Sequence, residues 1–134
     1  MTYTVKEFTQ MFHVTEHTVR YYTDIGLLPC NRDGGNHRVF DDSAANWMRG
    51  ITCLKSCGMP IKDIKRYIDL CQMEESEENL LARYRIIAKQ REAAHKKVAE
   101  AKATADYMDF KLKHYEEILA GHIPDDTNPA NWSD

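Results

Sequence analysis

The chain opens with an apolar pattern that has helical spacing. Val5, Phe8 and Phe12 recur at three- and four-residue steps and so share one face of a helix. Thr4 precedes this pattern and Glu7 follows it by three residues, which is the arrangement of a capping box. We therefore predict a short helix that begins after Thr4 and buries one side.

A second short helix follows almost at once. His13 and Val14 form the predicted turn, and Thr15 is a good N-cap for the next segment. Val19 and Tyr22 face inward in this segment, whereas most of its other side chains are polar. Two short helices joined by a tight turn are typical of a helix-turn-helix, although a helical hairpin inside any small domain has the same pattern.

A predicted β-hairpin and two more helices complete the first half. Gly34 and Gly35 stand between two short extended segments, and we expect them to supply the positive φ of a tight turn in a two-stranded wing. Residues 41–43 begin a third helix, which Gly58 ends. A fourth helix runs from about residue 61 to residue 71. This order of elements is a much narrower signal than a helix-turn-helix alone.

The second half reads as one long helix. Ser76 is a good N-cap, and no Pro or Gly follows it before Gly121, which allows a helix of about 65 Å at ~1.5 Å per residue. Apolar residues recur at alternating steps of four and three, with a break at Arg91. We call these positions the seam: Leu80, Tyr84, Ile87, Ala94, Val98, Ala101, Ala105, Met108, Leu112, Tyr115 and Leu119. This period predicts a dimerising coiled coil. A helix folded back across its own domain is the alternative, and it leaves apolar surface exposed.

We therefore predict a mainly α fold with three parts. Residues 1–72 form a winged helix-turn-helix domain, residues 73–120 a linker and long dimerisation helix, and residues 121–134 a short polar tail. The composition, with 43% hydrophobic and 29% charged residues, is ordinary for a globular protein. No apolar run reaches the roughly 18 residues of a membrane span, and the N-terminus lacks a signal-peptide pattern. We expect a cytoplasmic protein that has no membrane contact and free thiols.

The net charge of −3 is unevenly distributed. Residues 1–71 contain nine Lys or Arg and eight Asp or Glu, whereas residues 72–134 contain nine and thirteen. A nucleic-acid surface must then be a local basic patch in the first half. The chain has no Gly-rich phosphate loop, nucleophile elbow or paired His and carboxylate motif, so we predict neither enzyme activity nor a cofactor. A coiled-coil interaction protein that does not bind DNA is a further alternative, but it leaves the wing unexplained.

Residues 2–71 resemble the DNA-binding domain of the MerR family of bacterial transcription regulators. The matching segments are residues 3–7, 14–29, 36–40 and 54–64. His37 and Pro60 depart from the usual family residues. The resemblance implies a homodimer that binds a dyad-symmetric promoter operator in double-stranded DNA. It also implies that the dimer activates or represses by deforming this DNA for RNA polymerase in response to an effector.

The resemblance also implies which side chains contact DNA. Arg20, Tyr21 and Arg38 match family positions that touch the phosphate backbone. Lys62, on the fourth helix, is a candidate for a further phosphate contact. For the two arginines, a solvated surface charge is the alternative.

Two residues near the exposed start of the second helix are candidates for reading bases. They are His17 and Thr18. A bystander role for His17 is the alternative.

One cysteine suggests the effector. Trp47, Met48, Ile51 and Leu54 form the apolar stripe of the third helix, and Cys53 projects about 150° from it at ~100° per residue. A cysteine at this position resembles the branch of the family that responds to aldehydes and thiol stress. We therefore predict that Cys53 senses an electrophile. A small residue packed against the partner's long helix is the alternative.

Two other kinds of effector stay open. Metal-sensing relatives have cysteines near both ends of the long helix, where this chain has none, although His114, His122, Asp125 and Asp126 are potential ligands. Drug-binding relatives have a large C-terminal domain, whereas residues 121–134 are too short and polar to form a pocket. We predict no metal site, and keep a metal- or small-molecule-responsive regulator as the alternative.

Overall fold

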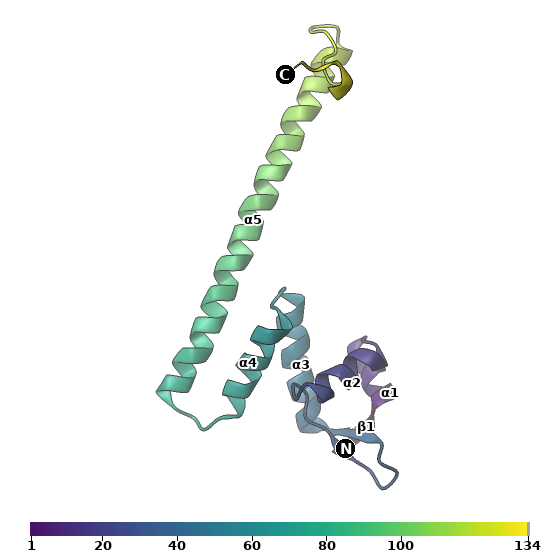
Figure 1. Cartoon of the computed structure of the whole chain (residues 1–134), viewed down its shortest axis with the longest axis vertical. Coiled ribbons are helices and arrows are strands. Elements are labelled where there is room, and N and C mark those ends of the chain that lie inside the picture. The colour runs from purple at the N-terminus through teal and green to yellow at the C-terminus, as the bar shows by residue number, and fades with distance from the viewer. Residues whose placement is uncertain (134) are drawn as a thin grey trace. The chain divides into compact units, whose positions relative to one another are not determined.

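The computed structural model describes residues 1–133, most of them helical (Figure 1). The elements are β1 (Thr2–Thr4), α1 (Val5–Phe12), α2 (Glu16–Asp24), β2 (Asn31–Arg32), β3 (Arg38–Asp41), α3 (Asp42–Ser56), α4 (Ile61–Gln72), α5 (Glu77–Leu119) and the 3-10 helix η1 (Pro129–Asn131). The chain forms two compact units, Met1–Arg91 and the residues from Glu92 onward, and α5 contributes to both. The predicted mainly α fold is confirmed.

The caps predicted for the first two helices are present. The Glu7 amide donates to Oγ1 of Thr4 at 3.1 Å, and the Glu7 carboxylate accepts from the Thr4 amide at 3.4 Å. Oγ1 of Thr15 accepts from the Thr18 amide at 3.1 Å and so caps α2. His13 follows α1 in the left-handed conformation, with φ 54°, and turns the chain between the two helices. The predicted helix-turn-helix therefore rests on local hydrogen bonds.

The wing differs from the prediction because it has a third strand. β3 pairs antiparallel with both β1 and β2, so the strand order is β1-β3-β2. Tyr3 lies opposite Phe40, and its hydroxyl donates to the Asp42 carboxylate at 2.7 Å. Since β1 has only three residues, it is too short to show an alternating pattern in the sequence.

The prediction that Gly34 and Gly35 supply the positive φ of the hairpin is wrong. Asn36 has the left-handed conformation, with φ 61°, and its amide donates to the Asp33 carbonyl at 3.0 Å. This is the three-residue loop whose last residue is left-handed. A Cβ at Gly35 would lie 2.9 Å from the exposed His37 ring, so a larger residue there would displace that ring.

One hydrophobic core joins the first four helices to the sheet. Phe8 and Phe40 are fully buried, and their stacked rings have centroids 4.2 Å apart. The other large side chains with at most 2% exposure are Val19, Leu27, Leu28, Met48, Ile51, Met59, Ile64 and Ile68. Burial of each contributes roughly 1.5–3 kcal/mol. This core fixes the helix-turn-helix against the wing.

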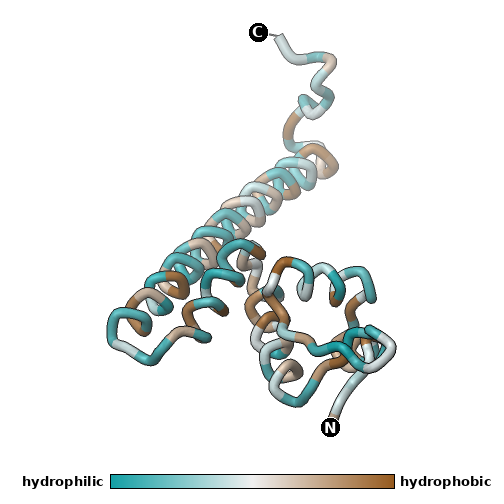
Figure 2. Tube along the Cα trace, turned by 60° about the horizontal axis from the view of Figure 1, so that its bottom comes forward, coloured by the Kyte–Doolittle hydropathy of each residue, from teal (hydrophilic) through white to brown (hydrophobic). Residues whose placement is uncertain are grey.

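The first turns of α5 pack on the same unit. The Ser76 hydroxyl accepts from the Asn79 amide at 3.0 Å, which confirms the predicted cap. Ile86 is the buried residue of α5, and Nε2 of Gln90 donates to the Cys57 carbonyl, at the end of α3, at 3.0 Å. Neither Ile86 nor Gln90 belongs to the seam. Hydrophobic positions continue along the rest of α5 (Figure 2).

The described part of the predicted polar tail contacts the end of α5. Gly121 has φ 81° and turns the chain after the helix. Nε2 of His114 donates to the Asp126 carboxylate at 2.5 Å. The indole N–H of Trp132 donates to the Asp126 carbonyl at 2.7 Å. These two bonds join the tail to itself and to the helix.

Candidate nucleic-acid interface

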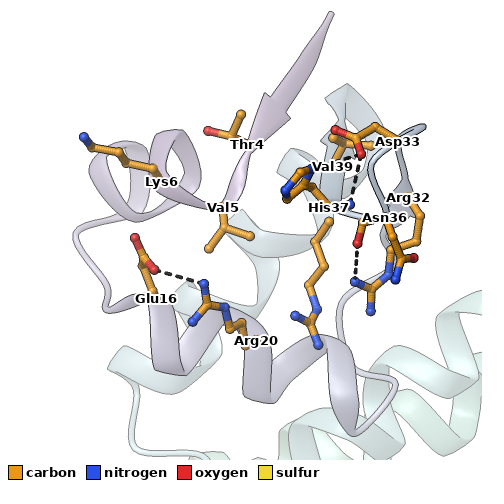
Figure 3. Close-up of a pocket in the computed structure, with 11 residues that line it drawn as sticks. Thr4, Val5, Lys6, Glu16, Arg20, Arg32, Asp33, Asn36, His37 and Val39 are labelled. Atoms are coloured by element: carbon orange, nitrogen blue, oxygen red, sulfur yellow. Dashed lines mark hydrogen bonds and ion pairs between the residues drawn. The ribbon is translucent and has the colours of Figure 1, made fainter.

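A groove of about 440 Å³ lies between the helix-turn-helix and the wing (Figure 3). The starts of α1 and α2 line one side, and the wing lines the other. Its charged lining residues are Lys6, Glu16, Arg20, Arg32, Asp33 and Arg38. Four of them are basic and two are acidic, so the groove is positive although the whole chain is negative. A positive groove attracts the phosphate backbone of nucleic acids.

Arg20 provides a positive charge whose ion pair within the protein is weak. Its Nη2 lies 3.2 Å from the Glu16 carboxylate, one helical turn earlier, and both side chains are about half exposed (Figure 3). An exposed pair of this kind stabilises a helix by only about 0.3–0.5 kcal/mol. Arg20 can therefore exchange Glu16 for a phosphate at little cost.

Arg38 connects the wing to α2. Its Nη2 donates to the Asp24 carboxylate at 2.9 Å, and its Nε donates to the Thr23 hydroxyl at 3.0 Å. The side chain is only 21% exposed. Arg38 thus fixes the wing against the end of α2. These two bonds use Nε and Nη2 of Arg38. Among the contacts of residues 1–133, Nη1 therefore remains available to bind a group from another molecule.

Asp33 organises the loop of the wing. Its carboxylate accepts from the backbone amides of His37 and Gly35, each at 2.9 Å. The bond from the His37 amide is the main cause that lowers the pKa of the Asp33 carboxyl. Nη1 of Arg32 donates to the Asn36 carbonyl at 3.1 Å, so the loop also positions this cation.

Two of the side chains predicted to contact DNA, Arg20 and Arg38, line the groove. Lys6, Arg32 and His37 line it as well, although they were not among the predicted DNA contacts. Arg32 and His37 flank the hairpin loop, and this position was a usable signal. Lys6 had no such signal, because it reaches the groove only through the packing of α1 on α2.

The other four predicted contacts lie outside the groove. His17 and Tyr21 are exposed on α2, and Tyr21 is 44% exposed. Thr18 is half-buried. Lys62 is exposed in the first turn of α4.

The four cysteines are free thiols that differ in exposure. Cys53 and Cys57 are exposed at the end of α3, whereas Cys30 and Cys71 are half-buried. Cys53 therefore lies off the buried side of its helix, as the helical projection predicts. Among residues 1–133, no three His, Cys, Asp or Glu side chains are grouped to bind a metal ion. No helix in this part of the chain is long and apolar enough to cross a membrane.

A capped helix-turn-helix, a wing and a positive groove between them define a DNA-binding winged-helix domain. The family described as MerR HTH regulatory proteins matches residues 3–71. The chain belongs to the MerR family and is a DNA-binding transcriptional regulator.

Several relatives match this chain over most of the length of both proteins. An uncharacterised HTH-type transcriptional regulator of Haemophilus influenzae is 31% identical over 121 residues, which cover 90% of this chain and 88% of the relative. The crystal structure of HiNmlR, described as a MerR family regulator lacking the sensor domain and bound to promoter DNA, is 30% identical, with a TM-score of 0.69 and 90% of both chains covered. A MerR family regulator from Bacillus thuringiensis is 29% identical, with a TM-score of 0.65, and the match covers 86% of this chain and 100% of that one. These relatives are regulators rather than enzymes.

Proposed function

We propose that this regulator is a homodimer that binds a dyad-symmetric promoter operator and deforms the DNA in response to an effector. Residues 1–72 bind one half-site, residues 73–120 dimerise, and residues 121–134 form a tail. The deformed promoter is then used by RNA polymerase. The similarity to HiNmlR, whose structure contains promoter DNA, supports promoter DNA as the partner.

The unpartnered seam of α5 is the observation that carries this proposal. All eleven apolar seam residues are exposed in the single chain. Leu112 is 60% exposed and Leu119 is 84% exposed. A long row of exposed apolar side chains marks an interaction surface, and its 3.5-residue period fits a second helix of the same kind.

Arg91 favours an antiparallel direction of pairing. In a parallel, in-register dimer, Arg91 faces Arg91 of the partner subunit, and two like charges meet inside an apolar seam. An antiparallel dimer can instead set Leu80 opposite the partner's Leu119. Arg91 then faces the partner's Met108 and lies next to the partner's Asp109.

The charges along α5 support the same direction. Residues 83–97 contain six Lys or Arg and one Asp or Glu, whereas residues 100–117 contain three and five. Antiparallel pairing places the basic half beside the partner's acidic half. Parallel pairing places the two basic halves side by side. Complementary charges thus favour antiparallel over parallel pairing of the two helices.

When the dimer binds DNA, the groove between the helix-turn-helix and the wing of each subunit follows the phosphate backbone. Arg20 and Arg38 contact phosphates from the groove, and Tyr21 and Lys62 add contacts from its surroundings. The exposed start of α2 enters the major groove, where His17 and Thr18 read bases.

Two measurements test the dimer and its ligand. Sedimentation at micromolar concentration is expected to give twice the chain mass of 15.6 kDa. A band shift with the DNA upstream of the chain's own coding sequence is expected to resist competition by unrelated DNA, and a heat-denatured sample is the control. A monomer, or a shift that unrelated DNA abolishes, contradicts the proposal.

We assign the effector to electrophile chemistry at Cys53. The sulfur adds to an aldehyde carbon, and the thiol proton passes to the carbonyl oxygen, so no oxidant is needed. The exposure of Cys53 supports access by such a reagent. The adduct changes how the DNA-binding domain packs on the dimer helix and so changes the shape of the promoter.

The matched controls for this assignment are the other thiols. Cys53→Ser is expected to keep operator affinity and to lose the transcriptional response to aldehydes or quinones. Cys57→Ser, which changes another exposed thiol directly after the same helix, and Cys30→Ser are expected to respond normally. A full response from Cys53→Ser shows that this thiol is a packing residue and that the effector binds elsewhere.

A further inference from the structure

A half-buried thiol connects α4 to α5. Nη1 of Arg83, in the second turn of α5, donates to Sγ of Cys71, in the last turn of α4, at 3.9 Å. Tyr67 lies one helical turn before Cys71 on α4. Burial is the main cause that raises the pKa of the Tyr67 hydroxyl, and the neighbouring Cys71 side chain raises it further. We call these three residues the thiol cluster. None of them lines the groove or belongs to the seam.

The guanidinium of Arg83 has more hydrogen-bond donors than the cluster satisfies. Its side chain is only 22% exposed, and its Nη2 lies 3.9 Å from the carboxylate of Glu75, which is too far for a hydrogen bond. The sulfur of Cys71 is a weak acceptor. The Nε atom of Arg83 is buried and has no acceptor among residues 1–133. Since buried donors are almost always paired, this Nε marks a place for a further acceptor beside the thiol.

An oxygen atom bonded to Sγ of Cys71 is an acceptor that fits this place. Such an oxygen can approach the guanidinium of Arg83 to the roughly 2.7–3.2 Å of a hydrogen bond, closer than the sulfur itself. The Tyr67 hydroxyl keeps its proton, because its pKa is raised, and can donate to the same oxygen. Positive charge beside a cysteine also favours the thiolate, which is the form that oxidants attack.

We propose that the thiol cluster is a site at which a hydroperoxide oxidises Cys71 to a sulfenic acid. The sulfur attacks one peroxide oxygen, so an S–O bond forms and the O–O bond breaks. The thiol proton passes to the oxygen that leaves, which becomes water or an alcohol. The sulfur loses two electrons and the peroxide gains them, so no other reactant is needed. Arg83 and Tyr67 hold the new oxygen.

The oxidation adds a bond between two helices. Residues 73–76 connect α4 to α5 without regular secondary structure. The oxygen on Cys71 accepts from Arg83 and so fixes the end of α4 to the start of α5 more firmly than the sulfur does. The reaction therefore acts where the DNA-binding domain joins the helix that carries the seam. It needs neither the proposed dimer nor the electrophile chemistry proposed for Cys53.

The other half-buried thiol provides a contrast. Cys30 lines a small cavity of about 120 Å³ together with Asp41. Its neighbour there is a carboxylate rather than a guanidinium, and a negative charge opposes the formation of a thiolate. Cys30 and Cys71 belong to the same burial class, so they separate the effect of Arg83 from the effect of access.

Dimedone labelling tests the site. The full chain is treated with an equimolar amount of hydrogen peroxide and then with dimedone, which couples to sulfenic acids, and peptide mapping gives the labelled fraction of each cysteine. Cys71 is expected to be labelled several-fold more than Cys30. Arg83→Met is expected to lower the labelling of Cys71 several-fold. Arg85→Met, which removes an exposed charge from the same helix, is the matched control and is expected to leave it unchanged.

A second variant separates the chemistry from folding. Tyr67→Phe keeps the ring and removes only the donor, so the labelled fraction of Cys71 is expected to fall faster when dimedone is added after a delay. Equal labelling of Cys71 and Cys30 in the unaltered chain, or equal labelling of Cys71 in the Met variants of Arg83 and Arg85, overturns the site. Either result leaves the proposed operator binding and dimer intact, because labelling needs neither.

Discussion

The two compact units use their hydrophobic residues in different ways. Among the described residues, all fourteen buried hydrophobic side chains lie before residue 92. From Glu92 onward, large apolar residues such as Val98 and Leu112 are more than half exposed instead. The first unit is therefore stabilised by its own core. The second unit has the apolar surface of a core without the partner that would bury it, and this difference separates effects on folding from effects on assembly.

The largest expected effect comes from breaking the core of the first unit. Phe8→Ala removes a fully buried ring that stacks on Phe40, and should lower the free energy of unfolding by about 3–5 kcal/mol. Urea denaturation measures it. The same change at exposed Phe110 is expected to cost about 1 kcal/mol or less. Equal losses at the two positions would contradict the contrast between the units.

The next effect separates assembly from folding. Leu112→Asp should weaken the dimer by a factor of about 10² to 10⁴, because each dimer loses two buried leucines at roughly 1.5–3 kcal/mol each. Sedimentation across a concentration series measures it. The core of the first unit is expected to stay intact. Ala103→Asp, which introduces the same charge outside the seam, is the control, and an equal loss from this variant would remove the seam from the interface.

A smaller effect is expected within the groove. Arg38→Ala removes a phosphate contact and also the wing's bond to Asp24, so operator affinity should fall about tenfold and the salt slope by about one unit. Arg20→Ala should lower the slope similarly with a smaller loss of affinity, because Arg20 has no bond to the wing. Asp24→Asn should weaken binding without changing the slope. An unchanged slope in both arginine variants would remove these residues from the DNA contact.

The sequence predicts the features that depend on local chemistry. Thr4 and Thr15 cap their helices as the short spacing to their partners suggests, and the exposure of the seam follows from its period. Contacts between distant residues were not predictable in this way. The bond from Arg38 to Asp24 spans fourteen positions. Lys6 reaches the groove only because α1 packs on α2.

Short elements were not predictable from the sequence for a related reason. β1 exists because β3 offers it a partner, and its three residues show no pattern of their own. The left-handed residue of the loop is Asn36 and not one of the expected glycines, because an asparagine tolerates this conformation. Each of these features depends on a neighbour that the folded chain supplies.

The smallest expected effect concerns the tail of the second unit. The bond from His114 holds the pKa of Asp126 below its usual value. A lowered carboxyl pKa stabilises the folded contact above the unfolded value of 3.8, and this contribution is lost as the pH falls through the lower folded value. Acidification below about pH 4 is therefore expected to loosen the tail. The fluorescence of Trp132, in a Trp47→Phe background, measures this change. Asp126→Asn should show the loosened signal already at neutral pH, with unchanged helical circular dichroism, and an identical acid response in this variant would show that the bond does not hold the tail.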